Sequence, residues 1–81
     1  MDDKSLTFEK AMIITRIEYL ILNMNNDPNY ISREIFHLID EHKISEIKDT
    51  IVYFYEALLH RGYQEYAKEF AEKYNIETRH S

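Results

Sequence analysis

The chain has 81 residues, a net charge of −5 and no cysteine, and 44% of its residues are hydrophobic. This length allows one domain, with enough apolar material for a folded core. The acidic balance argues against nucleic acids and anionic lipid surfaces as partners, because both attract basic faces. The lack of cysteine excludes disulfides and fits a reducing compartment, so we expect a cytoplasmic protein.

The first predicted helix runs from about Leu6 to Asn25, because apolar residues recur along it at the helical spacings of three, four and seven. Its expected inward stripe is Leu6, Ile13, Ile17, Leu20 and Met24. Ser5 is the expected N-cap, and Pro28 disfavours helical geometry at the residue before it. The most apolar window contains Arg16 and Glu18 and is too short to span a bilayer, so no membrane span is expected.

The second predicted helix spans about Ser32 to His42, with Ser32 or Asn29 as its N-cap. Its expected inward face is Ile35, Leu38, Ile39 and His42. The third predicted helix spans about Glu46 to His60 and is capped by Ser45. Its expected inward stripe is Ile47, Ile51, Phe54, Tyr55 and Leu58. The two helices are separated by a tight connection at Lys43 and Ile44.

The only glycine, Gly62, follows the last apolar residues of the third helix. A left-handed C-terminal cap is expected there, since glycine alone carries no Cβ to clash at positive φ. The fourth predicted helix spans about Tyr63 to Tyr74, with Tyr63, Ala67, Phe70, Ala71 and Tyr74 facing inward. The short connections and the scarcity of glycine and proline predict an all-α fold, a compact bundle of four helices. We expect one domain over residues 1–75 and a frayed tail over residues 76–81.

Several large apolar residues lie off these inward faces. They are Met12, Tyr19, Leu22, Phe36, Val52, Tyr53 and Leu59. A contiguous apolar patch on a small domain is typical of a protein interface, and tyrosine is enriched at such surfaces. The alternative is that the first helix lies at the centre of the bundle and is buried on several sides. We favour the interface and predict that these seven residues bind a partner. A second copy would also extend a small core, so we expect a homodimer.

Few residues form a pattern that could carry chemistry. Glu34 and His37 have the spacing of a di-iron bundle motif, but such a site needs a second motif and two more carboxylates. We interpret His37 and Glu41, and likewise Glu56 and His60, as local pairs on solvated faces. His42 is interpreted as a boundary residue. No nucleophile elbow, phosphate loop or zinc spacing is present, so we expect no catalytic residue, metal or cofactor.

Two alternatives to a protein-interaction module remain open. The predicted helices and turn from Glu34 to Arg61 are spaced like a helix-turn-helix, which would make the chain a nucleic-acid-binding regulator. Its third helix, however, offers a mixed and slightly acidic set of outer residues, Glu46, Lys48, Asp49 and Glu56. The second alternative is a structural helical subunit of a larger assembly.

The segment from Ile47 to Glu72 carries a short pattern of its own. Its residues are Ile47, Ile51 and Tyr55 along a helix, then Gly62, Tyr63, Ala67, Phe70 and Glu72. This pattern resembles the LisH motif, a short helical dimerisation module. The resemblance implies a helix pair that pairs again with a second copy. It departs from the family at Tyr66, where a small hydroxylated residue is usual, and in the substantial helix that precedes it.

The function that these features favour is an accessory one. We expect a small acidic helical regulator or inhibitor that binds itself and an unidentified protein without catalysis. The usage of isoleucine, lysine and asparagine suits an AT-rich genome, which favours a phage or bacterial source and an antiholin-like or antitoxin-like factor.

Overall fold

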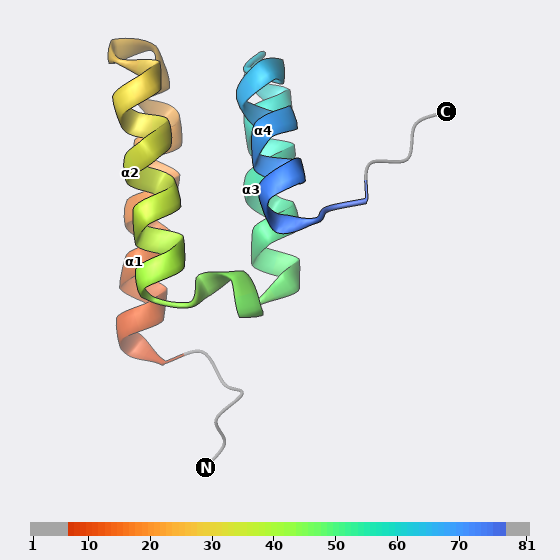
Figure 1. Ribbon diagram of the computed structural model, residues 1–81. Helices are drawn as coiled ribbons and strands as arrows, with labels where there is room; N and C mark the ends of the chain where they lie inside the picture. The colour runs from red at the N-terminus through yellow and green to blue at the C-terminus, as the bar shows by residue number, and fades with distance from the viewer. Residues whose placement is uncertain (1–6, 78–81) are drawn as a thin grey trace. The chain divides into compact units, whose positions relative to one another are not determined.

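The computed structural model describes residues 7–77, and these residues are helical without a strand. The helices are α1 (Phe8–Leu22), α2 (Pro28–Glu41), α3 (Lys48–His60) and α4 (Gln64–Tyr74) (Figure 1). Two short 3₁₀ turns, η1 (Met24–Asn26) and η2 (Ile44–Glu46), lie between them. The all-α prediction is confirmed. Contacts divide the chain after Glu46 into two units, and each unit is a helical hairpin.

The first hairpin begins with α1, whose N-cap is Thr7. The Thr7 hydroxyl accepts a hydrogen bond of 3.1 Å from the backbone N–H of Lys10. The predicted cap, Ser5, lies outside the described residues. The described helix begins at Phe8, and Leu6, the predicted start, also lies outside the described residues. The helix ends before Asn25, since the chain tightens into η1 after Asn23.

Helix α2 begins four residues earlier than predicted. Asp27 caps it by accepting a 3.4 Å hydrogen bond from the N–H of Tyr30, and Pro28 occupies the first helical position. Proline suits that position, because its fixed φ is helical and its missing N–H would have no intrahelical partner. Asn29 and Ser32 are therefore not the cap, and Ser32 lies buried inside the helix. The buried apolar face of α2 is Ile31, Ile35, Leu38 and Ile39.

The link to α3 is longer than predicted. Lys43 adopts a left-handed φ of 57° after α2, and the η2 turn follows with Ile44 fully buried. Ser45 lies within that turn, so it is not the cap of α3. Helix α3 begins at Lys48 and is preceded by Ile47 in an extended conformation.

The second hairpin joins α3 to α4 through Gly62, whose φ of 88° confirms the predicted left-handed cap. The backbone N–H of Gly62 donates a hydrogen bond to the Leu59 carbonyl oxygen, and the N–H of Tyr63 donates one to the Leu58 carbonyl oxygen. Each donor–acceptor distance is 3.0 Å. This bonding satisfies the last carbonyl groups of α3 in the manner of a Schellman cap. The buried residues of α4 are Ala67, Phe70 and Ala71.

The core consists largely of residues from the predicted inward stripes, but several members of those stripes are only half-buried: Ile13, Leu20, His42, Ile47, Tyr55, Tyr63 and Tyr74. Ile17, Ile51, Phe54, Leu58 and Phe70 are all buried as predicted. Leu20 is only half-buried, because it lies at the margin of the α1 face centred on Ile17. At the other end of the chain, Asn75 terminates α4 with a φ of 59° and Ile76 donates a hydrogen bond to Ala71. Residues 78–81 of the predicted tail lie outside the described residues.

Candidate protein-interaction surface

Helix α1 is apolar on two opposite sides. Ile17 and Ile21 are buried on the inner side. On the outer side Met12 is 56% exposed, Tyr19 64% and Leu22 56%. These three residues were predicted to point away from the inward stripe, and in the described chain they do. These outer side chains add no hydrophobic stabilisation when α1 folds, because their apolar area remains in water.

The outer side of α1 extends further than the three predicted residues. Phe8, at the first position of the helix, is 80% exposed, and Thr15 is exposed as well. At 3.6 residues per turn, the set lies within a sector of about 80°. We call this set the outer stripe of α1: Phe8, Met12, Thr15, Tyr19 and Leu22. Its members follow one another at intervals of four, three, four and three residues, a signal that the sequence already contained.

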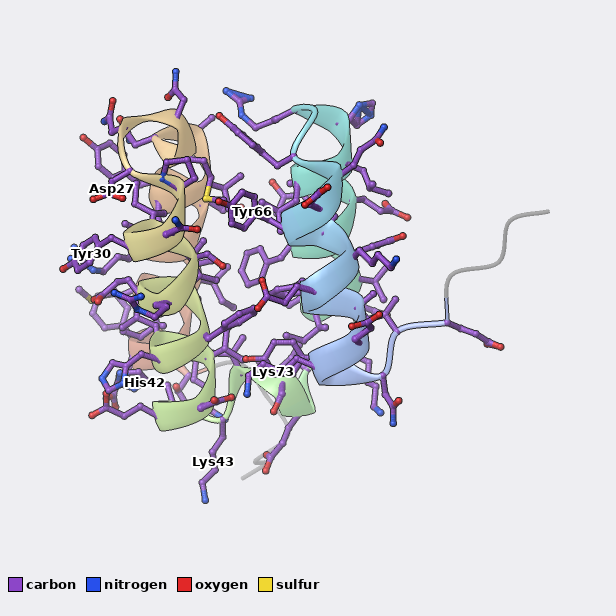
Figure 2. All side chains as sticks on the ribbon, turned by 45° about the horizontal axis from the view of Figure 1, so that its top comes forward. Asp27, Tyr30, His42, Lys43, Tyr66 and Lys73 are labelled. Carbon is purple, nitrogen blue, oxygen red and sulfur yellow. The ribbon has the colours of Figure 1, made fainter. Side chains whose placement is uncertain are left out.

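Helix α2 has a largely polar outer side. Phe36, predicted as a partner-binding residue, is half-buried, because it lies at the edge of the inner face. Tyr30, which was not predicted, is 55% exposed near the N-terminal end of α2, beside Asp27 (Figure 2). His37 Nε2 lies 2.9 Å from Glu41 Oε1 on the solvated side, as the spacing predicted.

The other end of α2 carries a contact between the two helices of the first hairpin. His42 and Lys43 lie at this end (Figure 2). The His42 side chain is 24% exposed, and its Nδ1 atom lies 3.8 Å from Glu9 Oε2 of α1. The Glu9 carboxylate itself remains 75% exposed. His42 therefore occupies the boundary of the hairpin, as predicted.

Helix α3 also exposes apolar side chains, but it divides them between two edges. Val52 and Leu59 are 39% and 38% exposed and lie seven residues apart on one edge. Tyr53 is 51% exposed, and the helical turn of about 100° per residue places it on the other edge. Its ring centroid is 5.8 Å from that of the buried Phe54. The spacing in the sequence already predicted this separation, with Val52 and Leu59 on one side of the inward stripe and Tyr53 on the other.

An open groove of about 1050 Å³ runs along the second hairpin. Tyr55 and Leu59 of α3 line it together with Ala71 and Ile76. Its charged and polar lining residues are Glu56, Gln64, Lys68, Glu72, Asn75 and Glu77. Sequence analysis missed this groove, because Ile76 was placed in a frayed tail. The groove is shallow and acidic at its rim, and Leu59 is the one predicted partner-binding residue that it contains.

Residues 7–77 contain neither a metal-binding cluster nor a candidate membrane span. Within that range no three histidine, aspartate or glutamate side chains stand close enough together to hold a metal ion. None of the helices described there is both long enough and apolar enough to cross a membrane. No protein-family model matches the chain, and no curated protein or solved structure matches it either. The resemblance of the segment from Ile47 to Glu72 to the LisH motif stays a prediction from its residues.

Proposed function

We propose that the chain is a small acidic protein-interaction module, an accessory regulator or inhibitor that acts by occupying a surface of another protein and that also associates with itself. The observation that carries the proposal is the exposed apolar set on α1 and α3. Six of the seven predicted partner-binding residues are between 38% and 64% exposed, and Phe36 is half-buried.

The chemistry of these side chains supports a protein as the partner. Tyrosine, methionine and phenylalanine are enriched at protein interfaces, where they bury a large area with little polar cost. The outer residues of α3 include Lys48, Asp49 and Glu56, a slightly acidic set that gives little attraction for phosphates. Protein recognition therefore accounts for the exposed residues better than nucleic-acid recognition does.

The proposal is tested by capture from extracts of the source cell with the full chain immobilised. Two double variants each place charges on one helix: Met12→Glu with Tyr19→Glu on α1, and Val52→Glu with Leu59→Glu on α3. Arg33→Glu on α2 is the matched control, because it changes the charge by the same two units at an exposed position outside both sets and outside the groove. We expect the control to retain the same proteins as the parent and at least one double variant to lose them. Unchanged capture and unchanged self-association in both folded double variants would contradict the proposal.

A further inference from the structure

The outer stripe of α1 has the spacing of a coiled-coil seam. Alternating intervals of four and three residues place Phe8, Thr15 and Leu22 at one core position of a heptad and Met12 and Tyr19 at the other. The stripe is separate from the buried face, which is centred on Ile17 on the opposite side of α1. Helix α1 can therefore pack on α2 with one face and receive a further helix on the other.

The stripe covers only two heptads, which is short for an isolated coiled coil. An isolated helix of this length must also overcome an unfavourable nucleation step. Here α1 is already helical, because Thr7 caps it and its inner face packs within the hairpin. The second helix consequently meets a surface that is formed before it arrives.

We propose that the outer stripe of α1 is the seam of an antiparallel contact with α1 of a second copy of this chain. The inference rests on the proposed function and names one partner and one geometry for it. In the proposed register, Met12 faces Thr15 of the second copy, and Phe8 faces Tyr19 of the second copy. A two-fold axis between the helices repeats each contact, as expected of a closed dimer.

The charges that flank the stripe select this register. In an antiparallel pair, the residue that directly follows a core residue at the Phe8 and Thr15 heptad position faces the equivalent residue of the other helix. In α1 these following residues are Glu9 and Arg16. In the proposed register Glu9 faces Arg16 of the second copy, and the reverse pair forms by symmetry. The Glu9 carboxylate is accessible to a second copy, since it is 75% exposed and its contact with His42 Nδ1 is a long one of 3.8 Å.

The two other arrangements lack such pairs among the described residues. Sliding the antiparallel helices by one heptad brings Arg16 opposite Arg16 of the second copy and Glu18 opposite Glu18 of the second copy. A parallel pair brings Ala11 opposite Arg16 of the second copy and Glu18 opposite Asn23 of the second copy, so within residues 7–77 it forms no pair of opposite charges. Flanking charges commonly set the orientation of paired helices, so the antiparallel register is the one that the sequence favours.

Orientation is tested by exchanging charges and measuring the dimer dissociation constant of the full chain by sedimentation equilibrium. Glu9→Arg alone and Arg16→Glu alone each create two like-charged pairs, and each should weaken the dimer about tenfold at low salt. An equimolar mixture of the two variants restores both pairs of opposite charges, so it should associate as tightly as the parent. Weakening without recovery in the mixture would overturn the antiparallel register.

Two substitutions test the seam itself, one expected to strengthen the dimer and the other to abolish it. Thr15→Leu replaces the one polar residue of the stripe with leucine, which should tighten the dimer by about tenfold. Tyr19→Glu should abolish dimerisation at micromolar concentration, because it buries a charge without a partner. Arg33→Glu is the matched control at an exposed position of α2 outside the stripe and should leave the dissociation constant unchanged, while circular dichroism verifies that every variant is folded.

A parent chain that stays monomeric, or a Thr15→Leu variant no tighter than the parent, would overturn the seam. The proposed function fails separately, if both folded double variants keep unchanged capture and unchanged self-association. A monomeric parent whose capture depends on Met12 and Tyr19 would thus remove the second copy as the occupant and leave the interaction module standing.

Discussion

In both hairpins the exposed apolar side chains lie mainly on the first helix. Among the described residues, eight large apolar side chains are exposed, and seven of them lie on α1 or α3, the first helix of each hairpin. The second helices, α2 and α4, present mostly charged outer sides. Each hairpin thus pairs a helix that is apolar on two sides with a helix that is apolar on one.

The difference lies in how the surplus apolar residues are spaced. On α1 they form one line, the outer stripe, whereas on α3 Tyr53 lies on a different edge from Val52 and Leu59. A single line can be covered by one further helix, but two edges cannot be covered by the same helix. Two segments of similar composition therefore offer different surfaces, because the intervals between apolar residues differ.

The largest expected effect separates inner from outer positions on α3. Phe54 is fully buried, so Phe54→Ala should lower the free energy of unfolding by about 3–5 kcal/mol. The neighbouring Tyr53 is half exposed, and Tyr53→Ala should cost about 1 kcal/mol or less. Urea denaturation of both variants measures the difference. Equal losses would mean that the assignment of the α3 faces is wrong.

A smaller effect is expected at the turn of the second hairpin. Gly62 has a φ of 88°, and a Cβ placed there meets no atom within 4 Å, so only backbone strain opposes substitution. Gly62→Val should cost about 1–2 kcal/mol in unfolding free energy. Gly62→Asn should cost less, since asparagine tolerates the left-handed region better. If valine and asparagine melted alike, backbone strain would not be the cause.

The corresponding test in the first hairpin concerns its caps. Thr7 accepts its hydrogen bond at 3.1 Å and Asp27 at 3.4 Å. Thr7→Ala and Asp27→Ala should each cost about 0.5–2 kcal/mol, with the longer bond of Asp27 towards the lower end. Thermal unfolding followed at 222 nm is the measurement. A Ser5→Ala variant that is more damaging than Thr7→Ala would return the cap to Ser5.

The smallest effect is expected on the outer stripe when the chain is dilute. Met12→Ala should change the unfolding free energy by no more than about 0.5 kcal/mol, because Met12 is 56% exposed, and Val52→Ala by no more than about 1 kcal/mol, because Val52 is 39% exposed. At high concentration only the parent and the Val52 variant should gain in melting temperature, through mass action. Identical concentration dependence in all three would contradict the distinction between α1 and α3.

The existence of each helix could be predicted from the sequence, but its limits could not. Hydrophobic period fixes which residues face inward, so Ile17, Ile51 and Phe54 were placed correctly. Helix starts depend instead on which of several nearby polar residues supplies the cap. Pro28 was interpreted only as a helix breaker, although directly after Asp27 it starts α2.

The candidate surface was predictable to a similar degree. Met12, Tyr19 and Leu22 were identified because they fall outside the inward stripe, and all three are exposed. Phe8 was not identified, although it lies four residues before Met12 on the same face of α1. Phe36 is half-buried because a residue at the margin of a face is covered according to the size of its neighbours, which spacing alone does not reveal.

The short connections within the hairpins also bear on how quickly the chain folds. Asn23–Asp27 joins α1 to α2, and Arg61–Tyr63 joins α3 to α4, so each pair of helices meets after closing a small loop. Small loops lose little entropy on closure, and proteins dominated by such local contacts fold on the order of microseconds to milliseconds. Each hairpin should therefore form on that timescale, long before two copies at micromolar concentration collide productively, so that assembly follows folding as a separate, concentration-dependent kinetic phase.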